Sequence, residues 1–273
     1  MNIFYCLLLL NLQILNLPQP NIALSIINYT LMKLDLLVFA VHPDDAELSC
    51  GGILLAEKMK GKKTGVIDLT RGELGTRGTI EIRKEEAAVA AQILQLDVRE
   101  NLQMDDGFFK NDEINQRKVI VALRKYRPEI IFCNAPEDRH PDHGRSAQLV
   151  EDAAFLSGLR KIETCDQGKA QQEWRPKYVF NFIQDTYLSP NFVIDISDVM
   201  EQKLEAIKAY GTQFNSPDMS EPQTYISSPD FLDSIIYRSK MFGKMIGVNY
   251  AEGFISKKMI GFNSFDAFIK VNT

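Results

Sequence analysis

The chain has 273 residues, of which 45% are hydrophobic and 25% charged, an ordinary globular composition. Its net charge of −5 argues against a nucleic-acid-binding surface, which needs a basic stripe, and against a patch for anionic membranes. We therefore expect a small-molecule substrate, with no nucleic-acid or membrane partner. Four cysteines without a C-x-x-C pair favour reduced thiols and a cytoplasmic protein.

Residues 1–31 contain no charged residue, and their apolar run is interrupted by polar side chains. That run is short for a membrane span, and a secretory signal would need a positive amino-terminal region. A signal or anchor is the alternative to an upstream extension before Met32, where "MKLDLLVFAV" opens like a β-first domain. We predict that 1–31 is an extension from a misassigned start and that 32–273 is a single domain.

Apolar runs alternate with amphipathic stretches along the next part of the chain. We predict buried strands over 34–41, 64–70, 98–104 and 129–136, and helices over 51–63, 80–96, 112–126 and 144–159. Because parallel strands need helical crossovers, this alternation predicts a Rossmann-like α/β fold with a doubly wound, mainly parallel sheet. Further on, strands at 176–183 and 191–197 and a helix at 198–214 indicate a C-terminal α/β elaboration.

All three histidines lie in two short motifs, "HPDDAE" at 42–47 and "DRHPDH" at 138–143. Each motif follows a predicted strand, at the sheet edge where open α/β folds bind ligands. If the two strands are neighbours, two imidazoles and one carboxylate can meet there and leave a coordination position for water, which is the pattern of catalytic zinc. One aspartate of the pair would ligate the metal and the other would deprotonate the water. The third histidine would stabilise an oxyanion or protonate a leaving amine.

For either motif alone, a structural turn and helix cap is the alternative to a metal site. Proline and aspartate favour turns, and the adjacent Asp44 and Asp45 suit a helix N-cap and first turn. The two motifs together hold every histidine, and this concentration favours the metal site.

The paired motifs resemble those of the PIG-L/LmbE-type zinc-dependent N-acetylglucosamine deacetylases, and the resemblance covers nearly all of 32–273. It implies that zinc is held by His42, Asp45 and His143, with Asp44 as general base and His140 assisting at the oxyanion. Fe²⁺ or another divalent ion is an alternative to Zn²⁺. The resemblance also implies a homo-oligomer, trimer-based or hexameric.

One departure points to a branch of that family. Many members have Glu directly after the Asp pair, whereas this chain has Ala46 and then Glu47, as in the bacillithiol-biosynthesis deacetylase, which acts on N-acetylglucosaminyl-malate. The resemblance implies that Arg83, Arg139 and Glu47 line the substrate site. Guanidinium groups suit the two carboxylates of a malyl group. For Arg83 the alternative is a solvated helix charge paired with a nearby glutamate.

Three smaller signals border the expected site. The family often supplies a loop tyrosine, but that position falls on Phe231, and Tyr225 is either its substitute or a surface residue. Asp106 in "MDDG" is interpreted as an Asp-Gly turn, with a sugar contact as the alternative. The Gly-rich segment 71–78, "RGELGTRG", is predicted to be a flexible lid.

We predict a metal-dependent hydrolase that removes acetate from N-acetylglucosaminyl-malate. Within the same reaction class, the alternatives are chitobiose, an inositol-linked N-acetylglucosamine or a thiol conjugate. Two histidines and one carboxylate also describe a non-haem Fe(II) oxygenase, although the alternating helices disfavour the all-β folds common to those enzymes. A non-catalytic metal or sugar binder is the remaining alternative.

Overall fold

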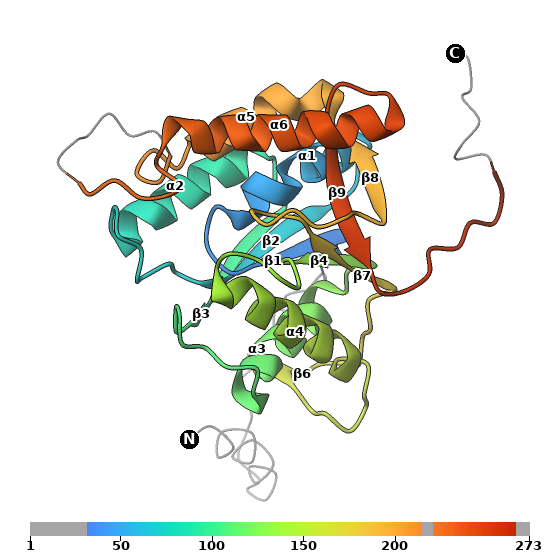
Figure 1. The fold of residues 1–273 in the computed structure, drawn as a ribbon. Helices are drawn as coiled ribbons and strands as arrows, with labels where there is room; N and C mark the ends of the chain where they lie inside the picture. Colours follow the sequence, from blue (N-terminus) through green and yellow to red (C-terminus); the bar gives the residue numbers. More distant parts are fainter. Residues whose placement is uncertain (1–31, 215–220, 266–273) are drawn as a thin grey trace, which may run out of the picture.

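The computed structural model describes residues 32–214 and 221–265, so the predicted extension 1–31 lies outside the described residues. The described chain forms a seven-stranded sheet between two layers of helices (Figure 1). The sheet order is β3-β2-β1-β4-β7-β9-β8, with β1 at Leu36–Ala40, β2 at Thr64–Thr70, β3 at Val98–Met104, β4 at Ile130–Cys133, β7 at Tyr178–Phe182, β8 at Phe192–Asp195 and β9 at Ala251–Ser256.

The strands from β3 to β7 in this order are parallel, which confirms the predicted Rossmann-like, doubly wound sheet. β9 lies antiparallel between β7 and β8 and extends the sheet at one edge. Of the predicted C-terminal elaboration, the strand at 176–183 is β7, which continues the parallel part of the sheet, whereas the strand at 191–197 is β8, which joins the sheet through the antiparallel β9.

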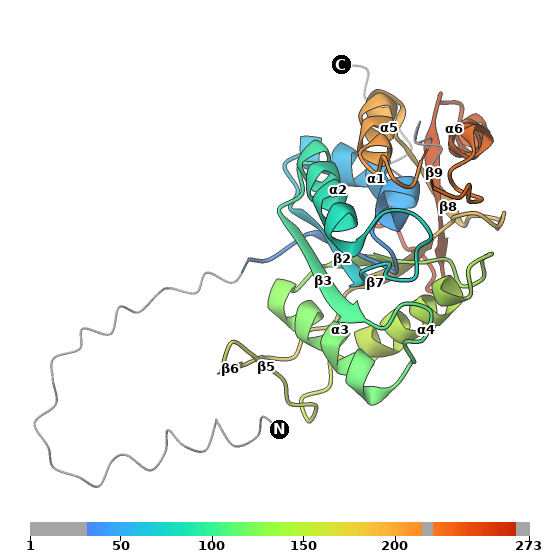
Figure 2. The ribbon, with the colours of Figure 1, turned by 90° about the vertical axis from the view of Figure 1, so that its left-hand side faces the viewer.

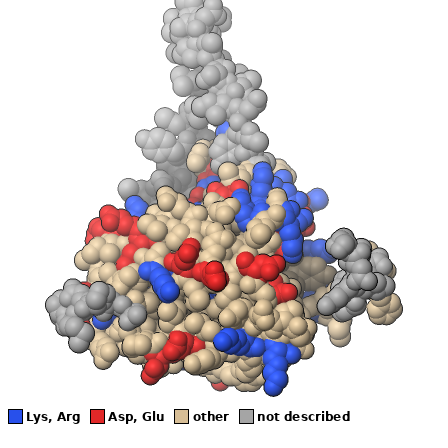
Figure 3. Space-filling model, turned by 90° about the horizontal axis from the view of Figure 1, so that it is seen from above, with Lys and Arg blue, Asp and Glu red and all other residues tan. Residues whose placement is uncertain are grey.

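Helices cover both faces of the sheet (Figures 1 and 2). One face carries α3 (Glu113–Tyr126) and α4 (Pro141–Leu156), and the other carries α1 (Asp45–Met59), α2 (Ile80–Ile93), α5 (Met200–Lys208) and α6 (Pro229–Ile246). Within the described ranges, every helix is too short or too polar to cross a bilayer. Figure 3 shows the face over α5 and α6. Among its described residues, acidic and basic side chains are scattered between many uncharged ones.

The burial of β1 explains its unbroken apolar sequence. Leu37 and Phe39 belong to the hydrophobic core under α3 and α4, whereas Leu36, Val38 and Ala40 belong to the core under α1 and α5. A strand buried on both faces has no solvent side on which a polar residue would be favourable.

The two histidine motifs run into the helices that follow them. α1 begins at Asp45 and α4 at Pro141, whereas the sequence predicted helices from residues 51 and 144. The first turn of each helix carries the acidic or imidazole side chains of its motif, so the apolar periodicity that reveals a helix becomes clear only after it.

Several C-terminal elements escaped the sequence prediction. They are α6, β9 and a short hairpin formed by β5 (Cys165–Asp166) and β6 (Lys169–Ala170). The helix predicted at 198–214 is shorter, because a 3₁₀ turn (Ser197–Val199) precedes α5 and turns follow it.

A buried ion pair joins the C-terminal elements to α1. The carboxylate of Glu252 on β9 accepts hydrogen bonds from the backbone N–H groups of Gly52 and Ile53, each at 2.8 Å, and Lys203 Nζ on α5 lies 2.7 Å from it. Both charged side chains are at least 97% buried. The pair therefore fixes β9 and α5 against the helix that starts at the first histidine motif.

Candidate active site

The two histidine motifs meet at the carboxyl ends of β1 and β4. β1 pairs with β2 on one side and with β4 on the other, so the strand order reverses between β1 and β4, which is where such sheets bind ligands. The expectation that the two strands are neighbours is confirmed. The ring centroids of His42 and His143 lie 5.8 Å apart, and His140 lies 4.8 Å from His42 and 5.3 Å from His143.

His42, Asp45 and His143 can hold a metal ion, because one ligand atom from each lies within 4.8 Å of the others. Nδ1 of His42 is 3.6 Å from one oxygen of Asp45, and Nε2 of His143 is 3.4 Å from the other. Two imidazole nitrogens and one carboxylate are a donor set for zinc or ferrous iron. The residues present therefore fit a divalent cation.

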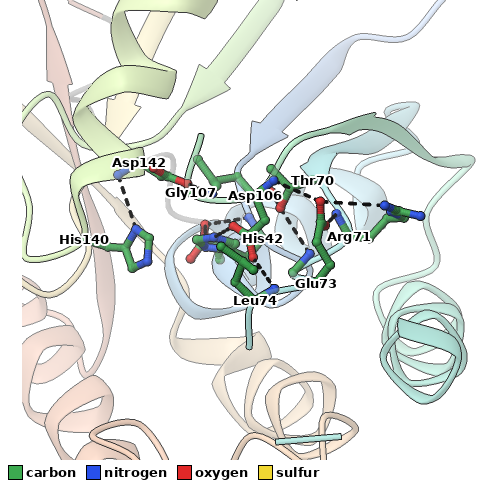
Figure 4. Close-up of polar contacts among 12 residues, drawn as sticks. His42, Thr70, Arg71, Glu73, Leu74, Asp106, Gly107, His140 and Asp142 are labelled. Atoms are coloured by element: carbon green, nitrogen blue, oxygen red, sulfur yellow. Dashed lines mark hydrogen bonds and ion pairs between the residues drawn. The ribbon is translucent and has the colours of Figure 1, made fainter. Parts of the chain in front are cut away.

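A further carboxylate orients each of these imidazoles from its other nitrogen. Nε2 of His42 lies 2.9 Å from Asp106 (Figure 4), and Nδ1 of His143 lies 2.5 Å from Asp138. Such outer carboxylates fix the ring and tautomer of a metal-ligating histidine. Asp106 does lie in a turn before Gly107, as predicted, but its contact is with His42. The sequence analysis missed Asp138, although it opens the second motif.

The electrostatics of this cluster favour a cation. Burial opposes protonation of His42, but its hydrogen bonds to Asp106 and Asp45 raise its pKa to about 10. Burial likewise opposes protonation of His143, yet Asp45 and Asp138 raise its pKa to about 9. Burial alone would raise the pKa of Asp45, but His143 and His42 hold it well below the usual range. Three carboxylates thus surround two imidazoles, and positive charge is stabilised between them.

His42, His140 and Asp142 form a second group with the same spacing of ligand atoms. Asp142 already pairs with Arg145 at 2.6 Å and accepts the backbone N–H of Gly107 at 2.8 Å. Asp45 instead accepts hydrogen bonds from neutral amides, those of His42 N, Asn134 and Gln184. The carboxylate of the first group is therefore the better cation ligand.

Asp44 occupies the N-cap position of α1 in a strained backbone conformation, with φ 130° and ψ −29°. Its side chain makes no capping hydrogen bond, and instead accepts one from Nη2 of Arg83 at 2.5 Å. The turn-and-cap alternative therefore describes its position but not its bonding. Burial raises the pKa of Asp44 to about 7, although the Arg83 guanidinium acts in the opposite direction. Such strain persists mainly at functional sites.

His140 is the N-cap of α4, and its Nδ1 accepts the backbone N–H of Asp142 at 3.3 Å (Figure 4). This hydrogen bond assigns the proton of the neutral ring to Nε2. Burial, together with the neighbouring His42 and His143, lowers the pKa of His140. A neutral imidazole follows from these contacts, and within residues 32–214 and 221–265 its Nε2–H has no hydrogen-bond partner.

A cavity of about 310 Å³ lies over this cluster. Segment 74–76 of the predicted lid forms part of its wall, and the face of α6 that carries Phe231, Ile235 and Arg238 forms another part. The lid segment is tied to Asp106, which accepts the backbone N–H of Leu74 at 3.1 Å (Figure 4). The mobility of this segment stays a prediction.

Arg83 and Arg139 both line the cavity, but each already contacts a carboxylate. Arg83 is 7% exposed and bonds to Asp44, so the alternative of a solvated helix charge is wrong. Arg139 lies at the exposed rim, where its Nε bonds to Asp185 at 3.1 Å and its guanidinium covers the ring of Tyr225. A contact of either arginine with substrate stays a prediction.

The expected substrate contact of Glu47 is wrong in this structure. Glu47 belongs to α1 and is fully buried, outside the cavity lining, where it bonds to Arg99 and to the hydroxyl of Tyr210. It lies two positions after Asp45 on the helix, so its side chain points away from the face that carries Asp45.

The two aromatic positions near the expected loop tyrosine have different surroundings. Phe231 is buried and stacks on Phe214, with ring centroids 5.8 Å apart. Tyr225 is 57% exposed at the cavity rim, and its hydroxyl donates to Asp185 at 2.9 Å. The described loop thus brings a tyrosine to the rim, with its hydroxyl already bonded.

Comparisons with known proteins show which proteins this chain resembles. The model of the PIG-L family, described as GlcNAc-PI de-N-acetylase, matches residues 37–154, which include both motifs. A diacetylchitobiose deacetylase of Thermococcus kodakarensis is 28% identical over 222 residues, or 78% of this chain and 79% of that protein. A probable N-acetyl-alpha-D-glucosaminyl L-malate deacetylase 2 of Bacillus subtilis is 24% identical over 199 residues, 67% of this chain and 84% of that protein.

A solved structure supports the fold along most of the chain. The conserved protein TT1542 from Thermus thermophilus is 37% identical, with a TM-score of 0.76 over 84% of this chain and 97% of that one. Fold and donor set together define an α/β enzyme with a candidate metal centre at the point where its strand order reverses. Residues 37–154 of the chain carry a domain of the PIG-L (LmbE-like) deacetylase family, hydrolases that act on N-acetylglucosamine-type substrates.

Proposed function

We propose that this protein is a zinc-dependent deacetylase whose substrate is N-acetylglucosaminyl-malate. The observation that carries the proposal is the cluster of His42, Asp45 and His143, with Asp44 and His140 beside it, in a single cavity. Zinc is the proposed ion because the donor set combines imidazole nitrogens with one carboxylate, and Fe²⁺ is the alternative with the same donors.

A divalent metal ion held by His42, Asp45 and His143 would lower the pKa of a water molecule and polarise the acetyl carbonyl. Asp44 is the proposed general base, because its buried carboxylate has a pKa of about 7 and lines the cavity. The Arg83 guanidinium fixes its orientation. Asp44 accepts a proton from the attacking water and returns it to the leaving nitrogen, so that acetate and a free amine result.

His140 is proposed to donate a hydrogen bond to the developing oxyanion. Its Nδ1 is occupied by the backbone N–H of Asp142, which leaves Nε2–H as the donor. A preorganised donor of this kind stabilises charge in the transition state without reorganisation.

The malate conjugate is the proposed substrate because a cavity with several arginines in its wall suits a carboxylated aglycone. The Bacillus subtilis relative supports this assignment, although at only 24% identity. Diacetylchitobiose is the second candidate, because the Thermococcus kodakarensis relative is more similar, at 28% identity. Inositol-linked and thiol-conjugated N-acetylglucosamine remain further alternatives, and the homo-oligomer stays a prediction.

The test is acetate release by the full-length, zinc-loaded protein, with N-acetylglucosaminyl-malate, diacetylchitobiose and N-acetylglucosamine compared under identical conditions. A kcat/KM highest for the malate conjugate supports the proposal. Preference for diacetylchitobiose would contradict the proposed substrate but would still support the deacetylase activity. Release of no acetate from any of the three, by protein that contains stoichiometric zinc, would contradict the proposed activity on these substrates.

A further inference from the structure

Three arginines line the cavity, and their partners differ. Arg83 is paired with Asp44, and Arg139 is paired with Asp185. Arg238 lies within ion-pair distance of no carboxylate among the described residues, and its hydrogen bonds go to two backbone carbonyls, those of Gln184 and Leu48. The cavity therefore contains one guanidinium whose charge has no direct counter-ion.

The position of Arg238 follows from the periodicity of α6. Phe231, Ile235 and Arg238 are spaced by four and three residues, so they share the face of the helix that turns toward the cavity. The first two are buried apolar residues that anchor the helix. Arg238 extends this face into the cavity wall, next to Leu48 of α1.

The two carbonyls hold the guanidinium in place without neutralising it. A guanidinium offers five N–H donors in a planar fork, and the contacts with Gln184 and Leu48 use only part of them. Burial lowers the pKa of Arg238 to about 10, so the group is still charged at neutral pH. A partly buried guanidinium with no carboxylate beside it is stabilised when an anion joins it.

We infer that Arg238 is the residue that binds a carboxylate of the substrate aglycone and thereby selects carboxylated N-acetylglucosamine conjugates. The inference rests on the proposed deacetylase function and names the side chain that recognises the malyl group. A carboxylate matches the planar fork and accepts two parallel hydrogen bonds from it. Arg83 is occupied by Asp44, and Arg139 is exposed to solvent at the rim, so neither offers an equivalent site.

Gln184 places this recognition site close to the chemistry. Its side-chain amide donates to Oδ1 of Asp45 at 2.9 Å, while its backbone carbonyl accepts from Arg238. One residue thus bridges a candidate metal ligand and the proposed anion receptor. An aglycone carboxylate on Arg238 would be held at a fixed place relative to the acetyl group that is cleaved.

The test compares kcat/KM for N-acetylglucosaminyl-malate and for the neutral methyl N-acetylglucosaminide in the full-length enzyme. Arg238→Met should lower the malate-to-methyl ratio by about 10- to 100-fold, mainly through KM, because charge-assisted hydrogen bonds are lost. Lys244→Met is the matched control, since it removes the same charge from the exposed side of the same helix and should shift the ratio less than about twofold.

If Arg238→Met lowers kcat/KM equally for both substrates, the inference is overturned. Arg238 would then stabilise the fold or assist the chemical step and would not recognise the aglycone. N-Acetylglucosamine 1-phosphate serves as a third substrate, and a larger Arg238 dependence for it than for the malate conjugate would exclude a carboxylate as the preferred anion. If Arg238→Met does not fold, Arg238→Lys keeps the charge without the fork and should still lower the ratio by at least about threefold.

Calorimetric titration of L-malate into metal-free protein separates this inference from the proposed function. If the enzyme hydrolyses none of the offered conjugates, the proposed substrate fails, yet L-malate should still bind to wild-type protein and bind at least tenfold more weakly to Arg238→Met. Absent binding to the wild-type protein, or binding that survives the substitution, overturns the role of Arg238.

Discussion

Nη2 of Arg83 donates a hydrogen bond of 2.5 Å to Asp44, and both side chains are buried beneath the cavity. This contact adds a role to the substrate contact expected for Arg83, which stays a prediction. The guanidinium holds the proposed general base while Asp44 adopts a backbone conformation with φ 130°.

Removing the guanidinium should therefore impair the chemical step more than substrate binding. We expect Arg83→Met to lower kcat by about 10- to 100-fold, as is typical for loss of a charged hydrogen bond, with a smaller change in KM. Steady-state kinetics on the best substrate checks this split. Arg83→Lys should recover part of kcat, and a loss confined to KM would instead indicate a substrate contact.

Asp44 should be needed for turnover but not for metal binding. Asp44→Asn keeps the shape of the side chain and removes its basicity, so kcat should fall by about 100- to 10,000-fold. The zinc content of the purified variant, measured by elemental analysis, should equal that of the wild type. Loss of metal together with activity would place Asp44 among the ligands and return Asp45 to an outer position.

Asp138 should matter for metal affinity although it lies outside the proposed set of ligands. It holds Nδ1 of His143, and Asp138→Asn should weaken zinc binding by about 10- to 100-fold. Competition with a fluorescent chelator measures that affinity directly and without any assay of turnover. Glu113→Gln, at an exposed carboxylate on α3, serves as the control and should bind zinc like the wild type. Unchanged affinity in Asp138→Asn would show that this contact does not orient the ligand.

The buried pair of Lys203 and Glu252 should dominate the stability of the C-terminal part of the sheet. Lys203→Met leaves a buried carboxylate without its cation and should lower the free energy of unfolding by about 3–5 kcal/mol. Urea denaturation of metal-free protein measures this change. Lys60→Met, which breaks the exposed pair with Glu57, should cost at most about 1 kcal/mol. Equal effects of the two variants would contradict a special role for the buried pair.

The elements around the two motifs were predictable because their signals are local. The apolar run of β1 reflects burial on two faces. The strong helix formers over 80–96 predicted a helix whose bounds agree with those of α2 within a few residues. The meeting of the motifs was predictable because topology rules place strand ends at one edge. All three histidines lie in those motifs, and the structure brings them together.

The remaining features depend on contacts between distant parts of the chain. Glu47 has the residue type of a site residue, but Arg99 and Tyr210, which reach it from β3 and from the turn after α5, bind it in the core. Arg238 lies in no motif, and its proximity to Gln184 appears only when α6 packs over the sheet. The hairpin of β5 and β6 is too short for a periodic signal.

The residues proposed for hydrolysis and the residue proposed for recognition of the aglycone lie in different parts of the sequence. The residues proposed for metal binding and proton transfer all fall between positions 42 and 143, inside the segment that the family shares, whereas α6 starts at Pro229. If Arg238 binds the aglycone as proposed, substitutions on α6 can change substrate preference without altering the residues proposed for hydrolysis. A chimaera that receives α6 from a relative with another preference should inherit that preference and keep its own catalytic groups.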